Sequence, residues 1–326
     1  MRTDQRYQEG QFTVSRFRAM GCACQIVGVT GDDPEASVRL ASAEALVRVV
    51  EKTLSRFDPE SELSRLNNRA GQWVQVSPLL WSALDHALSS ARATHGIYDP
   101  TVLGALKAWG YNRSFEEVQA TPIWVEEVSS PPGRWQDVRT DPATRSVFLP
   151  PGVGIDLGGI AKGWTADILC HALADMGPVL ADLGGDICAL GVPPGHKAWP
   201  VAVANPFQPE ADVALLAVAN AGVATSGVDF RRWATPKGLA HHIIDPRTGK
   251  PAETDVFTAT VVAPSGLQAD LFALVCVLLG TEQALAMLSR MEGMEGLLIT
   301  KDGRILWSRG LERYLIEVYG TKGGGA

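Results

Sequence analysis

The chain has no long hydrophobic run and no strongly basic stretch. Its 326 residues contain no apolar segment of about 18 residues or more, so the sequence predicts no transmembrane segment. The polar stretch 1–11 lacks the apolar core of a secretory signal and no lipid-attachment motif is visible, which favours a cytoplasmic setting. Lys and Arg number 29 against 36 Asp and Glu, giving a net charge of -7. Without a basic cluster, nucleic acid is not expected as a partner.

Cysteine is scarce, and the cysteines that are present do not form a recognisable framework. The five cysteines are an odd number and all lie in apolar surroundings. This predicts small reduced core residues and argues against a set of disulfides. The spacing of Cys22-Ala23-Cys24 is wrong for a zinc ribbon.

The composition predicts a folded chain with a sizeable core, because 46% of residues are hydrophobic and 20% are charged. Helical and strand patterns are mixed without regular alternation, which favours an α+β fold of mainly antiparallel sheets covered by helices. No repeat or linker is visible, so we predict one domain over 1–326, with 1–11 and 321–326 flexible. Strands are predicted over 12–20, 22–29, 146–149, 179–190, 201–204, 215–219, 222–225, 258–263, 296–300 and 305–308, and helices over 36–57, 61–67, 79–94, 103–109, 160–173, 267–279 and 282–290.

The stretch Val153–Gly163 organises the chain. An apolar extended run stops at Asp156, the pair Gly158-Gly159 follows, and a helical pattern then begins. We predict a strand, a glycine turn and a helix whose exposed N–H groups can hold phosphate, with Lys162 adding a positive charge. The alternative is a tight turn in which glycine only permits close packing.

Two further motifs carry small or acidic residues. The segment Asp182-Leu183-Gly184-Gly185-Asp186 is a second glycine pair, which fits either part of a site or a bulge or tight turn in a strand. Thr225-Ser226-Gly227 is suited to hydrogen-bonding a phosphate or a ribityl chain, and an ordinary turn is the alternative.

Two segments carry titratable groups. In His241-His242, neighbouring side chains point to opposite sides of an extended chain, so one histidine can face a cleft as acid, base or ligand. The Asp-Pro-Arg-Thr-Gly that begins at Asp245 also fits a plain turn. Asp270 lies in an otherwise apolar helix start, where a carboxylate must be paired, act as a cap or bind a cation.

Taken in order, these motifs resemble one family. The chain looks like an FAD:protein FMN transferase of the ApbE type from about Phe17 to Ser308. The matching segments are Met20-Gly21, Ser55-Arg56-Phe57-Asp58 to Asn67, Tyr98-Asp99-Pro100-Thr101 to Trp109-Gly110, Asp156 to Gly163, Asp182 to Asp186, Thr225 to Gly227, His242 to Pro246 with Gly249, and Ala269-Asp270.

The resemblance implies an ApbE-like (T-fold-like) architecture and magnesium-dependent transfer of FMN from FAD to a Thr or Ser hydroxyl of a flavoprotein, with AMP released. The expected acceptor is a protein with an Asp-x-x-Thr or Asp-x-x-Ser segment. The resemblance also implies His242 as the catalytic residue and the Gly159 carbonyl and Asp270 as metal ligands. It implies an FAD site at Met20, Phe57, Tyr98, Asp99, Asp156, Lys162, Thr225, Ser226, Gly227 and Ile244.

The chain departs from the family pattern at three positions. Cys22 stands where Thr is usual, and Phe57 stands where Tyr is common. Leu274 replaces a Thr whose hydroxyl lies near the metal, so we expect Mg²⁺ to bind weakly without FAD. Two other functions stay open: an FAD-binding or FAD-sequestering protein without transfer, and an FAD pyrophosphatase that yields FMN and AMP.

Overall fold

The computed structural model describes residues 12–31, 33–120, 125 and 132–319. The ends predicted to be flexible, 1–11 and 321–326, lie outside the described residues. Contacts divide the described residues into two units, each built from separate parts of the sequence. The sheet unit takes its residues from Met1–Arg48, Lys162–Gly227 and Thr254–Ala326, and the helical unit from Val49–Ala161 and Val228–Glu253. The single domain stays a prediction.

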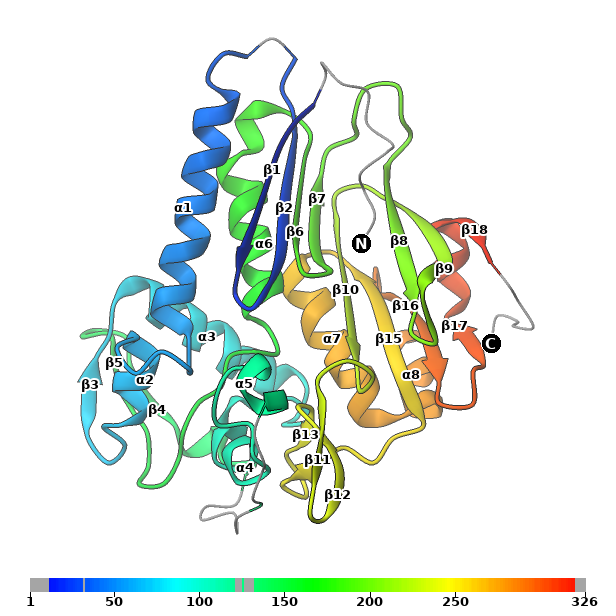
Figure 1. Ribbon diagram of the computed structural model, residues 1–326. Helices are drawn as coiled ribbons and strands as arrows, with labels where there is room; N and C mark the ends of the chain where they lie inside the picture. The colour runs from blue at the N-terminus through cyan, green and yellow to red at the C-terminus, as the bar shows by residue number, and fades with distance from the viewer. Residues whose placement is uncertain (1–11, 32, 121–124, 126–131, 320–326) are drawn as a thin grey trace. The chain divides into compact units, whose positions relative to one another are not determined.

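The sheet unit is built on one antiparallel sheet with the strand order β1-β2-β6-β7-β10-β15-β16-β17 (Figure 1). Every neighbouring pair in this sheet is antiparallel, which confirms the predicted α+β class with mainly antiparallel strands. Its strands are β1 (Phe12–Ala19), β2 (Cys22–Val29), β6 (Val179–Leu183), β7 (Asp186–Leu190), β10 (Ala221–Gly227), β15 (Val256–Ala263), β16 (Glu295–Thr300) and β17 (Ile305–Trp307).

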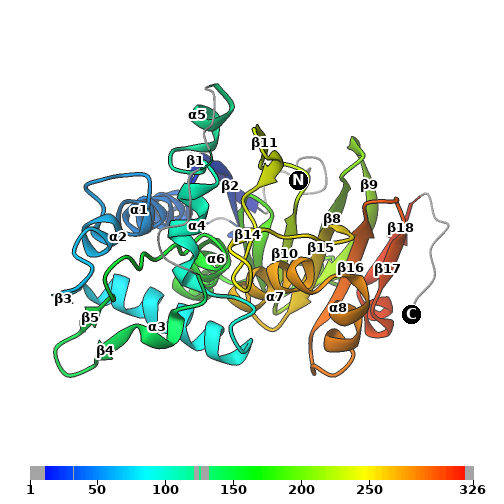
Figure 2. The ribbon, with the colours of Figure 1, turned by 90° about the horizontal axis from the view of Figure 1, so that it is seen from below.

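Both faces of this sheet are covered. Side chains alternate across a strand, so on β2 Ile26 and Val27 enter opposite hydrophobic cores. Ile26 packs with helices α1 and α6, whereas Val27 packs with a second sheet of order β18-β9-β8. Helix α7 lies along β10 and β15 (Figures 1 and 2). These remaining elements are α1 (Ala36–Leu54), α6 (Ala161–Ala172), η3 (Ala174–Met176), β8 (Trp199–Asn205), β9 (Gln208–Val218), α7 (Gly266–Leu279), α8 (Thr281–Leu288), η4 (Arg309–Arg313) and β18 (Leu315–Val318).

The helical unit contains short helices and small sheets. The helix predicted over 79–94 is confirmed as α3, which Ser77 caps by accepting a hydrogen bond from Leu80 N, with Pro78 as the first helical residue. The elements of this unit are α2 (Glu62–Asn67), β3 (Trp73–Gln75), α3 (Pro78–Ala93), η1 (Pro100–Val102), α4 (Leu103–Ala108), α5 (Phe115–Ala120), η2 (Trp135–Asp137), β4 (Arg139–Asp141), β5 (Ser146–Phe148), β11 (Arg232–Thr235), β12 (Gly238–His241), β13 (Ile244–Asp245) and β14 (Lys250–Pro251).

Two element predictions were wrong. The predicted single strand 179–190 is a hairpin of β6 and β7, because Gly184 and Gly185 both adopt positive φ and reverse the chain. The predicted strand ending at Asp156 has no strand partner, although its apolar residues are buried as expected. Instead, Asp156 N donates to the Pro100 carbonyl at 2.8 Å, and the Ile155 backbone bonds to the Asn67 side chain. Most other predicted helices and strands are found within a few residues of their expected bounds.

No helix in the described parts of the chain combines the length and the hydrophobicity that a bilayer crossing requires.

Candidate functional site

In the helical unit, Arg56 joins two residues that the sequence assigned to the FAD site. Its guanidinium carbon lies 4.0 Å from the ring centroid of Phe57 and 4.3 Å from that of Tyr111. Its Nε lies 2.6 Å from Asp156 Oδ2, and its Nη1 donates to the Tyr111 carbonyl at 2.7 Å. The Arg56 side chain is only 6% exposed, whereas Phe57 is 41% exposed and presents an aromatic surface to solvent.

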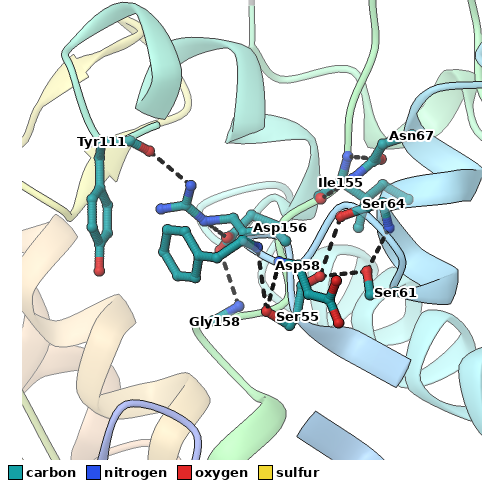
Figure 3. Close-up of polar contacts among 11 residues, drawn as sticks. Ser55, Asp58, Ser61, Ser64, Asn67, Tyr111, Ile155, Asp156 and Gly158 are labelled. Atoms are coloured by element: carbon teal, nitrogen blue, oxygen red, sulfur yellow. Dashed lines mark hydrogen bonds and ion pairs between the residues drawn. The ribbon is translucent and has the colours of Figure 1, made fainter. Parts of the chain in front are cut away.

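The backbone around Asp156 is held by a side chain from α2 (Figure 3). Asn67 Nδ2 donates to the Ile155 carbonyl at 2.9 Å, and Asn67 Oδ1 accepts from Ile155 N at 2.7 Å. Asp156 Oδ1 then accepts from Gly158 N at 2.9 Å, at the glycine turn before α6. The predicted glycine turn is therefore present, with the Asp156 carboxylate bound to both the turn and Arg56.

We predict that Arg56→Ala lowers the free energy of unfolding by about 2 kcal/mol. Removing the guanidinium leaves the largely buried carboxylate of Asp156 without its cation. Because Asp156 is partly exposed, solvent screens its charge and reduces the loss of stability. A lysine side chain keeps the charge but lacks the planar fork, so Arg56→Lys should recover only part of this loss. Urea unfolding measures the effect, and Arg304→Ala, in an exposed ion pair, is the control with a change below about 0.5 kcal/mol. Equal unfolding midpoints for Arg56→Ala and the parent chain contradict this role.

Tyr98 and Asp99 are buried in the helical unit. Asp99 caps η1: its Oδ1 accepts from Thr101 N at 2.7 Å and from Thr101 Oγ1 at 2.6 Å. Burial raises the pKa of Asp99, while hydrogen bonds from Thr101 and Trp135 oppose the rise. Asp99 thus organises its own loop, and its role toward FAD stays a prediction.

The two adjacent histidines have different surroundings, as predicted. His241 is buried and its Nε2 lies 3.2 Å from the Ala252 carbonyl, whereas His242 is half-buried. The backbone N–H of His242 donates to the Arg231 carbonyl at 3.2 Å, which fixes it at the base of the β11–β12 hairpin. Ile244 follows on β13 and is buried in a cluster with Tyr111 and Trp233. The predicted turn after Asp245 is confirmed, since it joins β13 to β14.

In the sheet unit, Met20 lies at the tip of the β1–β2 hairpin with φ 53°, next to Gly21 at φ 69°. Cys22 occupies the position where the family usually has Thr, and its Sγ donates to the Ala19 carbonyl at 3.3 Å. A Cβ placed on Gly184 would lie 2.7 Å from the Cβ of Cys22. Glycine is therefore required at Gly184 both by its φ of 72° and by this neighbour. The five cysteines are thiols, as predicted.

Lys162, expected to act on phosphate, forms an ion pair with Asp186. The Asp186 side chain is 1% exposed and that of Lys162 is 19% exposed. Asp182 accepts from Gly185 N at 2.7 Å, and burial raises the pKa of Asp182. The second glycine motif therefore combines a tight turn with a carboxylate that holds Lys162.

Asp270 does not cap its own helix, which is the capping role the sequence left open. Ser265 caps α7, and Asp270 Oδ2 instead accepts from Gly163 N, in the first turn of α6, at 3.1 Å. In return, Asp167 of α6 accepts from Gly266 N at 2.6 Å and from Leu267 N at 2.9 Å. Each helix thus supplies a carboxylate that accepts from N–H groups in the first turn of the other, and the two helices lie side by side in Figure 2. Burial raises the pKa of Asp167, and the two N–H groups of α7 oppose the rise.

The ordinary-turn alternative for Thr225-Ser226-Gly227 is wrong, because these residues end strand β10. Thr225 is exposed, and its Oγ1 lies 2.8 Å from Thr260 Oγ1. Leu274 is half-buried and lies four residues after Asp270, on the same side of α7.

Mg²⁺ is a hard cation that proteins often bind through one or two carboxylates plus substrate phosphates. No cluster of three His, Cys, Asp or Glu side chains that could hold a metal occurs among the described residues. Asp270 is 3% exposed, and a carboxylate has about four lone-pair directions, so its bond to Gly163 does not exclude a cation. The donor set therefore fits a Mg²⁺ ion shared with phosphate and does not fit an all-protein metal cage.

Sequence reasoning missed Arg56 and Asp167 as organising residues, although Arg56 lay inside a recognised segment next to Phe57. In fold, the chain is an α+β protein whose main antiparallel sheet contains a glycine turn flanked by Asp182 and Asp186.

The comparisons with known proteins agree with this class. The model of the ApbE family matches residues 20–298, and the chain belongs to this family. The FAD:protein FMN transferase of Treponema pallidum is 33% identical over 90% of this chain and 85% of that protein. The FAD:protein FMN transferase of Haemophilus influenzae is 30% identical over 74% of this chain and 72% of that protein. These relatives are, by name, transferases.

Solved structures show the same fold. The crystal structure of the ApbE protein of Thermotoga maritima superposes with a TM-score of 0.84 at 25% identity, covering 94% of this chain and 100% of that chain. The Pseudomonas stutzeri flavinyl transferase ApbE gives a TM-score of 0.75 at 22% identity, over 90% of this chain and 92% of that chain.

Proposed function

We propose that this chain transfers FMN from FAD to a Thr or Ser hydroxyl of an acceptor flavoprotein, with Mg²⁺ as the cofactor. The observation that carries the proposal is the family match over residues 20–298, together with relatives named for this reaction. In the reaction, the hydroxyl oxygen bonds to the FMN phosphorus and the bond from that phosphorus to the bridging oxygen breaks. The hydroxyl proton passes to a base, and AMP leaves with the bridging oxygen.

Residues of the helical unit support a flavin-binding role. Phe57 offers an exposed ring whose position is held by the Arg56 guanidinium, and base or flavin rings stack readily on such a surface. Asp156, Tyr98, Asp99 and Ile244 are proposed as further FAD contacts on this unit. The loss of the Tyr hydroxyl at Phe57 leaves the stacking surface intact.

Residues of the sheet unit support a phosphate-binding role. Lys162 lies in the first turn of α6, where helix N–H groups and a cation both favour an anion. Its pairing with Asp186 fixes the ammonium group, so phosphate must share Lys162 with a carboxylate. Met20, Thr225, Ser226 and Gly227 are proposed as further FAD contacts on this unit.

Asp270 and the Gly159 carbonyl are proposed as the protein's Mg²⁺ ligands. When bound, Mg²⁺ neutralises charge that develops on the phosphate oxygens. His242 is proposed to take the proton from the acceptor hydroxyl, because histidine titrates near neutral pH and its backbone is anchored to Arg231.

Leu274→Thr should tighten Mg²⁺ binding several-fold and raise activity at limiting Mg²⁺. A hydroxyl in place of the half-buried leucine adds an oxygen on the side of α7 that carries Asp270. Calorimetric titration of Mg²⁺ in the presence of FAD measures the affinity, and Leu274→Val is a control without a hydroxyl. Equal Mg²⁺ affinity for the Thr and Val variants contradicts the proposed position of the metal.

The proposal is tested by chromatography of the nucleotides after incubation with FAD and Mg²⁺, with and without a peptide carrying an Asp-x-x-Thr core. AMP that appears only with peptide supports transfer. AMP and FMN formed equally without peptide indicate an FAD pyrophosphatase, and intact FAD in both samples indicates a binding protein. Calorimetry should also show tighter binding of FAD than of FMN, because the proposed site contacts the adenosine end as well.

A further inference from the structure

The β11–β12 hairpin of the helical unit is locally basic in an acidic chain. From Asp229 to Arg247 the chain carries Arg231, Arg232, Lys237 and Arg247 against Asp229 and Asp245, a net charge of +2, whereas the whole chain has a net charge of -7. Asp229 lies near Arg232, and Asp245 pairs with Arg247. Arg232 and Lys237 are exposed. This concentration of positive charge attracts an anionic partner to the hairpin.

One face of the hairpin is firmly anchored. Trp233 and Ala240, paired across the two strands, are 5% and 0% exposed and belong to the cluster that holds Ile244. Trp233 Nε1 also donates to the Trp109 carbonyl at 2.9 Å. The anchored hairpin is thus a preformed surface, so a partner does not have to order it on binding.

Two large apolar side chains are exposed on and beside the hairpin, Leu239 and Phe230. Leu239 is 67% exposed, and its cross-strand partner Ala234 is exposed beside it. Phe230, just before the hairpin, is 74% exposed while its ring lies 5.8 Å from that of Phe115. Exposed apolar groups next to cations are typical of a surface that recognises a polypeptide with both apolar and acidic side chains.

This surface is continuous with the proposed catalytic residue. His242 follows β12 directly, and its N–H bonds to the carbonyl of Arg231. Leu239 lies three positions before His242, which corresponds to about 10 Å along an extended chain. An extended peptide of a few residues is therefore long enough to span the distance between His242 and Leu239.

We propose that the exposed residues on and beside the β11–β12 hairpin, Phe230, Arg232, Lys237 and Leu239, dock the acceptor polypeptide. The partner is an extended segment that carries at least one carboxylate and one apolar side chain close to the modified hydroxyl. This inference rests on the proposed function and adds the surface that selects the protein substrate.

The test uses the full chain and a fluorescein-labelled peptide with a leucine beside an Asp-x-x-Thr core. Leu239→Ser and the double variant Arg232→Glu/Lys237→Glu should each raise the dissociation constant of the peptide about tenfold in fluorescence anisotropy, since a buried leucine or a reversed charge pair changes binding by about 1.4 kcal/mol or more. They should raise KM for the peptide similarly, while the affinity for FAD stays within about twofold. Replacing the Asp of the peptide by Asn should weaken peptide binding to the parent chain but hardly change peptide binding to the double variant.

Matched controls come from the sheet unit, where Ile316 is 55% exposed and Lys301 is exposed. Ile316→Ser and Lys301→Glu should leave peptide binding unchanged. Hairpin variants with unchanged KM and affinity for the peptide, in a chain that still modifies it, overturn the docking surface alone. If the hairpin variants bind FAD more weakly, these residues contact the phosphates of FAD and the docking surface is wrong. If the parent chain binds FAD but neither binds nor modifies the peptide, the transferase function itself is contradicted.

Discussion

Asp270→Asn is expected to lower the rate of Mg²⁺-dependent transfer by about two orders of magnitude while the chain stays folded. Asparagine keeps an oxygen that accepts from Gly163 N, so the start of α6 keeps its cap. The asparagine side chain lacks the negative charge of Asp270. Losing a charged ligand of a metal that stabilises the transition state by several kcal/mol should lower the rate of transfer about a hundredfold. Steady-state rates over a range of Mg²⁺ concentrations measure the loss.

Two further variants separate metal binding from helix capping. Asp270→Ala should lose both activity and stability, because Gly163 N then has no carboxylate to accept its hydrogen bond. Asp175→Asn, whose side chain is 70% exposed in the sheet unit, should change neither property. An Asp270→Asn variant with the Mg²⁺ dependence of the parent would show that Asp270 serves only as a helix cap.

His242→Ala should reduce the rate of transfer by about a hundredfold or more at saturating FAD, the usual contribution of a positioned general base. The affinity for FAD should change little, because the anchoring contact of His242 runs through its backbone N–H and survives the substitution. Added imidazole should restore part of the rate, which a merely structural role does not allow. The control is His196→Ala, at an exposed position of the sheet unit. A parallel fall in rate and FAD affinity, without rescue, contradicts a role as base.

The sequence predicted the main sheet well because its strands carry their own signals. The strands predicted over 12–20 and 22–29 were confirmed as β1 and β2, and those predicted over 296–300 and 305–308 as β16 and β17; each pair is antiparallel. Hydrophobic alternation and turn residues are local, so a single strand can be recognised without knowing its neighbours. The missed β11–β12 hairpin shows the limit, since only the short segment Pro236-Lys237-Gly238 signals its turn.

The organisation of the site depended on contacts that spacing does not encode. Arg56 meets Asp156 across 100 positions of sequence, and Asp270 meets Gly163 across 107. The sequence indicated that Asp270 needed a partner, because an unpaired buried carboxylate is costly, but it offered no means to choose α6 over a metal or its own helix. The Lys162–Asp186 pair is similar: both residues were singled out, and the fold joined them.

The proposed transfer leaves FMN covalently bound to an acceptor hydroxyl. Intact-mass spectrometry of the Asp-x-x-Thr peptide after incubation with the chain, FAD and Mg²⁺ tests it most directly. We expect a gain in mass of one FMN less one water, located at the Thr by fragmentation and absent from a peptide with Ala at that position. An unmodified Thr peptide, recovered beside free FMN and AMP or beside intact FAD, would contradict it.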